Sequence, residues 1–522
     1  MLKSLFIVIL TSTLLSIGWT TDLSLFLLVA FVPLFYFEEN NDNLIKIKKG
    51  KNLVVFLIFH LCFFLWNFIT TSWLQNATFW GGFMAIFFNS LFMAIIFFMF
   101  YIKKNSYTKI LRYVYLVSFW LIFEYAHHNW DLSWVWLTLG NGFAGTESLI
   151  QWYEFTGVFG GTLWILVTNI IAYEFFKNKK LGLSLSAIIF IPLLISISIY
   201  SLYKETVNPI KIVVVQPNID PYNEKFSDLS TDDQYRIFIK LGKTLTDQET
   251  DYIIGPETAL PGGYWVDSLN TDLLFNYVSK SLCDYPKLKL ITGISTYKHY
   301  TKESQLTATS KEMGDGTWYD SYNSAVQTDC NMNISLYHKS KLVSGVELMP
   351  YPELFKFLER FALDLGGTSG SLGTQKERSV FIDKTGKFKV APIICYESVF
   401  GEYVTGYVKN GATFLAIITN DGWWGDTWGY KQHLLYAKLR AIENRRSIAR
   451  SANTGISCFI NQKGNIILQT KYWEKDVIKG KINNNTKITF YTQFGDFIPK
   501  ISIFIFFALM FSSRFKIFRK TN

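Results

Sequence analysis

Three side chains that could take part in nucleophilic chemistry stand at the ends of short apolar runs. Cys395 ends the run in "APIICYES", Glu257 ends "DYIIGPE", and Lys339 ends "NISLYHK". The thiolate is the reactive form of cysteine, and a free thiol has a pKa of about 8.5. A carboxylate can accept the thiol proton, while an ammonium group can stabilise the thiolate and a later oxyanion. These residue types therefore predict a cysteine nucleophile assisted by a base and a cation.

Each of the three residues also has a purely structural interpretation when it is taken alone. Free cysteines behave mostly as small buried hydrophobes, so Cys395 could belong to a core. Glu257 could cap a turn with Thr258, and Lys339 could be a solvated charge at a strand end. The combination favours function, because sites in layered α/β domains form where strands hand over to loops.

The elements that would position these side chains lie in residues 204–498. This part of the chain has no apolar run long enough to span a membrane. Helices are expected over 232–246 and 430–446, and a hairpin is expected to turn at 463–464. Strands alternating with helices indicate an α/β layered domain. The β-rich runs cover residues 210–218, 251–257, 288–295, 333–339, 388–397 and 413–421.

Apolar segments dominate the rest of the chain. A helix that crosses a bilayer needs about 20 mostly apolar residues, and several segments reach that length. The first two segments and the last are short, so the first pair could be a re-entrant hairpin, and the first alone could be a signal peptide. We expect about eight transmembrane helices, at residues 5–19, 23–37, 53–70, 79–101, 111–125, 155–176, 181–203 and 501–512.

The basic residues indicate how these segments are oriented. The net charge is +10, and lysines or arginines gather in "IKIKKGK", "IKKNSYTK", "KNKK" and "RFKIFRKTN", which follow the second, fourth, sixth and eighth segments. The connections between these basic loops contain no Lys or Arg. Loops rich in Lys and Arg stay cytoplasmic, so both termini are expected inside and residues 204–498 outside. The charge then reflects membrane orientation, and we expect no nucleic-acid partner.

The motifs around the three reactive residues resemble a known superfamily. "GPETALP", "YHKSKL" with its later Glu, and "IICYE" resemble the Glu–Lys–Cys signature of the nitrilase (carbon-nitrogen hydrolase) superfamily. With about seven spans before it and one after it, the whole chain resembles the apolipoprotein N-acyltransferase family. The motifs "VVVQPNID", "WVWLTLGN", "TNDGWWG" and "QHLLYAKLRAIENRRSIARSANTG" extend the resemblance over nearly all the chain.

The resemblance implies a role for each residue of the signature. Glu257 would be the general base, Lys339 the residue that stabilises the oxyanion, and Cys395 the nucleophile. Lys341 is a rival to Lys339, but the family spacing to the later Leu and Glu selects Lys339. The supporting residues implied are Glu347, Tyr396 and Glu397.

Two departures from the family pattern concern the substrate loops. The family commonly has Pro-Phe-Gly-Glu where this chain has "SGVE" at 344–347, and a Trp after a Lys where this chain has Lys225 and Phe226. Aromatic side chains favour the membrane interface. We therefore expect substrates to pass Phe226, Trp423 and Trp424, although the two tryptophans could equally form a packed aromatic loop.

The resemblance also implies the fold and the reaction. The expected architecture is a multi-pass α+β protein with three parts. These are a seven-helix membrane domain (1–203), a periplasmic α-β-β-α sandwich of nitrilase type (204–498), and a last transmembrane helix with a cytoplasmic tail (499–522). The implied reaction is N-acylation of the N-terminal S-diacylglyceryl-cysteine of apolipoproteins, in the bacterial inner membrane. The implied donor is a phospholipid, phosphatidylethanolamine, and the implied enzyme is a monomer without cofactor or metal.

Two other functions share some of these features. A membrane-tethered nitrilase-like amidase would use the same triad without needing access to lipids. A transporter or sensor with a large outer domain would need no triad, but the spans contain few charges of the kind transport sites use.

Two of the remaining cysteines could form a disulfide. Cys283 and Cys330 lie in the part expected outside, where the compartment permits a disulfide. The sequence alone does not show whether they are close enough to pair.

Overall fold

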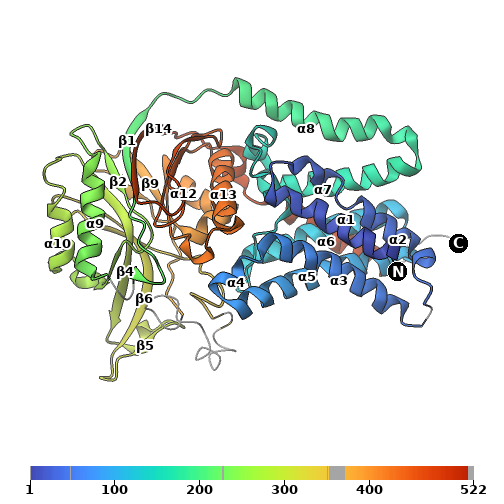
Figure 1. Cartoon of the computed structure of the whole chain (residues 1–522), viewed down its shortest axis with the longest axis horizontal. Coiled ribbons are helices and arrows are strands. Elements are labelled where there is room, and N and C mark those ends of the chain that lie inside the picture. The colour runs from blue at the N-terminus through green and yellow to red at the C-terminus, as the bar shows by residue number, and fades with distance from the viewer. Residues whose placement is uncertain (1, 48, 226–228, 350, 352–370, 515–522) are drawn as a thin grey trace. The chain divides into compact units, whose positions relative to one another are not determined.

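The computed structural model describes residues 2–47, 49–225, 229–349, 351 and 371–514. The chain divides into two compact units. The first unit combines Met1–Tyr203 with Phe494–Asn522, and the second is Lys204–Gln493. The second unit is thus inserted, in sequence, between two helices of the first (Figure 1).

The first unit is built from helices. Its long helices are α1 (Leu2–Thr20), α3 (Lys51–Thr71), α5 (Phe79–Ile102), α6 (Lys109–Asn129), α7 (Tyr153–Lys177), α8 (Gly182–Leu202) and α15 (Phe497–Arg514). Shorter helices are α2 (Val32–Leu44) and α4 (Leu74–Ala77), with short 3-10 turns such as Ser24–Leu28 and Leu139–Phe143.

Five helices among the described residues are long and apolar enough to cross a membrane. They are Leu2–Thr20, Lys51–Thr71, Phe79–Asn105, Tyr153–Lys177 and Lys179–Leu202, each at one of the eight predicted spans. The predicted span 23–37 is instead broken into a 3-10 turn and α2, whose second half carries Glu38, Glu39 and Asp42. The spans predicted at 111–125 and 501–512 lie in α6 and α15, and neither meets the same criterion. The number eight is therefore not confirmed.

Buried polar groups hold several of these helices together. Glu124 of α6 accepts hydrogen bonds from Thr162 of α7 (2.7 Å) and from the backbone N–H of Leu139 (2.8 Å). Arg112 of α6 donates two hydrogen bonds to Glu38 of α2, at 3.1 and 3.2 Å. Buried polar groups are stable only when they are hydrogen-bonded, and buried charges only when they are paired, so these contacts fix which faces of the helices meet.

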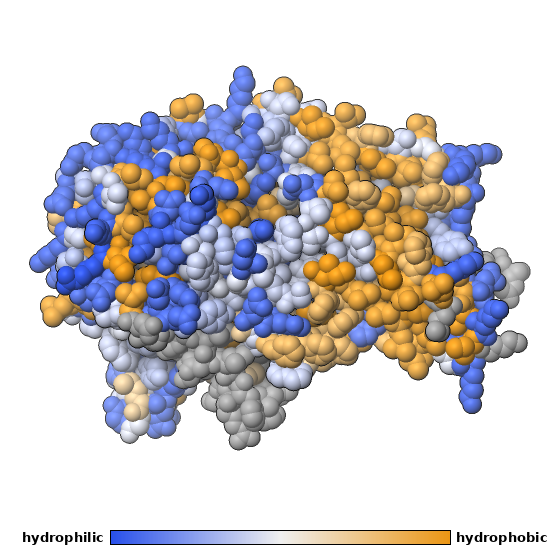
Figure 2. All heavy atoms as spheres, viewed as in Figure 1, coloured by the Kyte–Doolittle hydropathy of each residue, from blue (hydrophilic) through white to orange (hydrophobic). Residues whose placement is uncertain are grey.

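The outward faces of this unit are strongly apolar. Among the described residues of α8 only Ser196 is buried, whereas Leu183, Phe190 and Leu194 are 84%, 58% and 62% exposed. Figure 2 shows hydrophobic side chains covering the visible face of the helical unit. A large exposed apolar surface indicates contact with a membrane or a partner, and helices of this length and hydropathy fit a bilayer.

The second unit contains two β-sheets. The first has the strand order β14-β1-β2-β4-β6-β5, with β3 paired to β4 and β7 paired to β6. Its strands are β1 (Pro209–Gln216), β2 (Tyr252–Ile254), β3 (Leu260–Trp265), β4 (Lys289–Tyr300), β5 (Lys311–Glu312), β6 (Trp318–Asp329), β7 (Ser335–His338) and β14 (Asp476–Asn483).

The second sheet has the order β13-β12-β11-β10-β9-β8. Its strands are β8 (Phe381–Ile382), β9 (Lys389–Ile394), β10 (Phe414–Thr419), β11 (Ile448–Ala452), β12 (Cys458–Ile460) and β13 (Ile466–Gln469). The central strands β9, β10 and β11 run parallel, and β12 and β13 form the antiparallel hairpin predicted around 463–464.

The two sheets pack against each other. Ser451 of β11 donates a hydrogen bond to the Val215 carbonyl of β1 (2.7 Å), and the rings of Tyr252 and Phe414 lie 5.8 Å apart. The helices α9 (Thr231–Thr244) and α10 (Leu273–Lys280) cover the first sheet, and α12 (Gly401–Lys409) and α13 (Trp428–Asn444) lie beside the second (Figure 1). The predicted four-layer α-β-β-α arrangement is therefore present.

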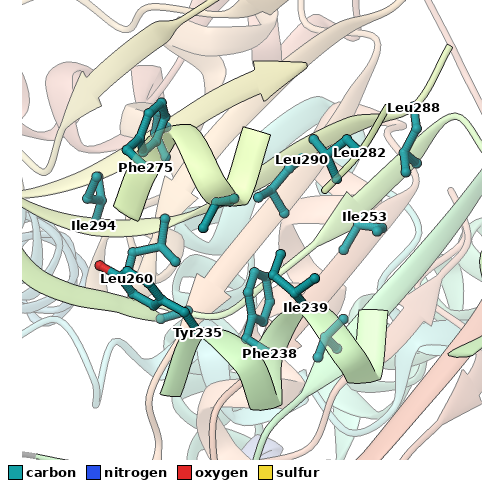
Figure 3. Packing of buried hydrophobic residues seen from close by; sticks show 14 of the residues in the cluster. Tyr235, Phe238, Ile239, Ile253, Leu260, Phe275, Leu282, Leu288, Leu290 and Ile294 are labelled. Carbon is teal, nitrogen blue, oxygen red and sulfur yellow. The ribbon is translucent and has the colours of Figure 1, made fainter. Parts of the chain in front are cut away.

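The outer layer of the first sheet shows why α9 forms where it does. The Ser230 side chain caps the helix by accepting the backbone N–H of Asp233. Tyr235, Phe238 and Ile239 then recur at helical spacing and face the sheet, where they join one apolar cluster with residues of β1 to β4 and α10 (Figure 3). Truncating a fully buried phenylalanine such as Phe238 to alanine costs about 3–5 kcal/mol. This packing fixes the strands that end in the site.

Candidate active site

The three reactive residues follow three strands of the second unit. Glu257 lies three residues after β2, Lys339 directly follows β7, and Cys395 directly follows β9. The first two strands belong to one sheet and β9 to the other, so both sheets contribute to the site. Glu257 and Lys339 are buried, and Cys395 is a half-buried free thiol.

A compact hydrogen-bond network joins Glu257 and Lys339. Lys339 Nζ lies 3.0 Å from Glu257 Oε1 and 2.8 Å from Glu347 Oε1. Asn323 Nδ2 donates to the same two oxygens, at 2.7 Å for Glu257 and 3.3 Å for Glu347. The backbone N–H of Asn420 donates to the second oxygen of Glu257 at 3.1 Å. Both oxygens of Glu257 are thus held, which fixes the direction in which it can accept a proton.

The charges of this network act directly on the thiol. Burial raises the pKa of Cys395, the carboxylate of Glu257 raises it further, and the ammonium of Lys339 lowers it. Burial alone would lower the pKa of Lys339, but Glu257 and Glu347 together raise it well above its ordinary value. Lys339 therefore stays charged, while Cys395 rests as a thiol and needs a base to become nucleophilic.

The backbone around Glu257 and Cys395 is unusual. Cys395 has φ +48° and Thr258, after Glu257, has φ +47°, which L-residues seldom adopt. Gly293 of β4 allows the loop that carries Glu257 to lie against the sheet, because a Cβ there would come 2.2 Å from the Thr258 backbone nitrogen. Lys225 holds the loop from the other side, donating to the Glu257 carbonyl (3.3 Å) and to the Thr258 hydroxyl. Backbone strain of this kind clusters at functional sites.

Glu397 connects the two strand ends that carry Lys339 and Cys395. It accepts the backbone N–H of Ser340, next to Lys339, at 2.7 Å, and that of Ile394, before Cys395, at 2.9 Å. Burial raises the pKa of Glu397. Its oxygens also accept hydroxyl hydrogen bonds from Tyr337, Tyr403 and Tyr407. Glu397 therefore ties the ends of the two strands together through their backbone.

Of the three residues expected to line the substrate path, the structure describes the two tryptophans. Trp423 and Trp424 are half-buried in a short turn after β10. The Tyr222 hydroxyl donates to the Trp423 carbonyl at 2.9 Å, and their rings lie 5.3 Å apart. Trp424 packs edge-on against His433, with 5.6 Å between ring centroids. Phe226 lies outside the described residues.

Known proteins match the two units separately and together. Residues 211–488 match the carbon-nitrogen hydrolase family, and residues 11–171 match the apolipoprotein N-acyltransferase N-terminal domain. The chain is 30% identical to an apolipoprotein N-acyltransferase of Chlorobaculum tepidum over 523 residues, which cover 96% of this chain and 95% of the relative. The chain belongs to the apolipoprotein N-acyltransferase family. A Rickettsia prowazekii family member is 30% identical over 77% of this chain and 76% of its own length.

The structure of this apolipoprotein N-acyltransferase family member adds residues that the sequence reasoning missed. Asn323 is shared by two carboxylates, and the Asn420 N–H holds Glu257. Lys225 holds the loop after Glu257, and burial lowers the pKa of its ammonium to about 8. Asn323 lies inside a strand, so nothing in its local sequence indicated this position. Asn420, in contrast, ends an apolar run just as Cys395 does.

Proposed function

We propose that this chain N-acylates apolipoproteins through a thioacyl-enzyme on Cys395. Family membership over nearly the whole chain supports the reaction class. The observation that carries the mechanism is the contact between Lys339 and Glu257, which joins two strand ends beside the free thiol. The acceptor is the α-amino group of an N-terminal S-diacylglyceryl-cysteine.

The first half-reaction loads the enzyme. Glu257 accepts the Cys395 proton, and the thiolate attacks the ester carbonyl of a phospholipid, for which we propose phosphatidylethanolamine. Lys339, with the backbone N–H of Tyr396, stabilises the oxyanion. The tetrahedral intermediate collapses, the lysophospholipid alkoxide takes the proton from Glu257, and the acyl chain remains on Sγ.

The second half-reaction transfers the acyl chain. The α-amino group of the diacylated apolipoprotein attacks the thioester and passes a proton to Glu257. The new amide leaves, and the Glu257 proton returns to the Cys395 sulfur. Because a covalent intermediate separates the two substrates, the kinetics are ping-pong. No cofactor is required, and one chain, as a monomer, carries all the reacting groups.

The placement in the membrane is part of the proposal. Both termini lie in the cytoplasm and the second unit lies on the periplasmic side of the bacterial inner membrane. The alternation of basic and non-basic loops supports this orientation. A second observation supports it independently, because Cys283 and Cys330 form a disulfide. Disulfides persist in oxidising compartments such as the periplasm and are rare in the cytosol.

Labelling in cells tests the orientation. In a Cys395→Ala background, a membrane-impermeant thiol reagent added to spheroplasts should label Lys387→Cys and leave Lys46→Cys unlabelled. Both positions are exposed. The opposite labelling pattern would refute the proposed topology.

Intact-mass measurement of the purified protein tests the reaction. After incubation with phosphatidylethanolamine vesicles, the wild-type chain should gain the mass of one acyl group, and Cys395→Ala should gain none. A diacylated lipopeptide should then discharge the adduct as a triacylated product. Continued N-acylation by Cys395→Ala would refute the mechanism. Hydrolysis of small amides without any phospholipid-dependent adduct would instead indicate the amidase alternative.

A further inference from the structure

His433 of α13 reaches the backbone of the nucleophile. Its Nε2 lies 3.2 Å from the Cys395 carbonyl oxygen and 3.0 Å from Ser398 Oγ, and Ser398 itself donates to the same carbonyl at 2.7 Å. A carbonyl oxygen can only accept hydrogen bonds, so His433 holds it in the form of the ring that carries a proton on Nε2. The Cys395 carbonyl is therefore held by side chains from two elements.

The other face of the imidazole is also fixed. His433 Nδ1 lies 2.9 Å from Asp421 Oδ1, and the second oxygen of Asp421 contacts Arg450 Nη2 at 2.6 Å. Arg450 and His433 hold the pKa of Asp421 well below its usual range, against the effect of burial. All three side chains are at most 1% exposed. Arg450 Nη2 also lies 3.3 Å from His433 Nδ1, so Asp421 and Arg450 both hold the ring that reaches the Cys395 carbonyl.

The carbonyl that His433 holds belongs to the same planar peptide as the Tyr396 N–H. Because a peptide bond is planar, holding the oxygen also fixes the direction of that N–H. Cys395 has φ +48°, a conformation that persists only where the surroundings impose it. Hydrogen bonds to a carbonyl also polarise the peptide and strengthen its N–H as a donor.

We propose that His433, supported by Asp421, is a positioning residue that aims the Cys395–Tyr396 peptide at the oxyanion. This inference rests on the proposed thioacyl mechanism. His433 does not touch the thiol proton in this role, since the general base is Glu257. Its effect is confined to steps that build negative charge on a carbonyl oxygen.

Two chemical probes of Cys395 separate this role from general support of the fold. Iodoacetamide alkylates the thiolate without forming an oxyanion, so its rate reports the thiol and its base. p-Nitrophenyl butyrate acylates the same sulfur through a tetrahedral oxyanion. In His433→Leu we expect acylation to slow at least about tenfold, while alkylation stays within about twofold of wild type.

Matched variants keep the test decisive. His433→Gln places an amide N–H donor at nearly the same distance from the backbone as Nε2, so it should recover most of the lost acylation rate. Ser398→Ala removes the other donor to the same carbonyl and should also slow acylation selectively. It serves as the test variant if His433→Leu does not fold.

The outcomes separate this inference from the proposed function. Equal slowing of alkylation and acylation, or slowing of neither, overturns the positioning role. Failure of wild type to form an adduct with phosphatidylethanolamine vesicles overturns the proposed donor. The p-nitrophenyl butyrate comparison still decides the role of His433 in that case.

Discussion

Replacing Lys339 with methionine removes the central cation of the site at nearly constant side-chain length. The ammonium is 2% exposed and touches Glu257 and Glu347, which are 8% and 15% exposed. Without it, the buried Glu257 and the half-buried Glu347 keep the amide of Asn323 as a shared donor. Like charges at such a site favour protonation of one carboxylate. A protonated Glu257 cannot accept the thiol proton as proposed.

The structure allows a magnitude for each effect. Removing one partner of a buried ion pair costs about 3–5 kcal/mol of stability. Removing one oxyanion donor lowers kcat by about 10²–10³. Loss of the base adds a further factor of about 10² or more. We therefore expect Lys339→Met to be markedly less stable and to form the thioacyl adduct at least about 10⁴-fold more slowly.

A double variant separates the two effects. Lys339→Met combined with Glu347→Gln leaves Glu257 as one carboxylate with its Asn323 and Asn420 donors. We expect the melting temperature to recover most of the loss, because the unpaired second charge is gone. The adduct rate should stay low, since the oxyanion donor is still missing. Differential scanning fluorimetry and intact-mass time courses measure the two quantities on the same samples.

Lys341→Met is the matched control. Lys341 lies two residues away, with its Nζ over the Phe400 ring (4.7 Å), and we expect near wild-type adduct formation. If the double variant regains adduct formation together with stability, Lys339 acts only as a structural counter-ion. If Lys341→Met is inactive and Lys339→Met is active, the wrong lysine has been assigned.

Three further perturbations have defined expectations. Cys283→Ser should lower the free energy of unfolding by about 2–4 kcal/mol and leave adduct formation at low temperature unchanged, whereas equal melting points for oxidised and reduced protein would contradict this. Tyr337→Phe removes a hydroxyl donor to Glu397 and should lower the free energy of unfolding, measured by chemical denaturation, by about 1–3 kcal/mol. Tyr403→Phe removes another such donor and should lower it by a similar amount. The pKa of Lys225 is about 8 in the fold, below the usual 10.5, so the unfolded chain binds more protons between these values and stability should rise with pH there. A Lys225→Met variant should lack that rise in melting curves at pH 8 and pH 10, and an identical slope would show that Lys225 is solvated.

The residue types of the candidate site can be read from the sequence, whereas the residues that hold them in place cannot. Glu257, Lys339 and Cys395 have reactive side chains and stand at the ends of apolar runs. Such runs predict strands, so the sequence also indicates where these strands end. Asn323 and His433 hold those residues through contacts between distant segments. Such contacts depend on how the sheets pack, which local sequence does not encode.

The membrane part shows the limit of reading hydropathy alone. Apolar runs that are long enough to cross a bilayer form helices of that length in the structure, such as residues 53–70 in α3. The run 23–37 is as apolar, yet the chain turns within it. Its backbone there is held by α7, because Asn169 accepts the N–H of Phe31 (2.7 Å) and donates to the carbonyl of Leu27 (2.7 Å). Hydrogen bonds to α7 thus replace helical ones where the predicted helix 23–37 is interrupted, and composition alone does not reveal this interruption.

The pairing of β1 with β14 bears on how the chain is synthesised. Pro209 pairs with Asn483, so the first and last strands of the second unit are neighbours although 274 positions (483 − 209) separate them. At a synthesis rate of about 5–20 residues per second, β14 emerges about 14–55 s after β1. Contacts of such long range make folding slow and leave one edge of β1 open meanwhile. Nascent chains of this protein should therefore depend on a holding chaperone for longer than its size suggests, until the last strand has emerged.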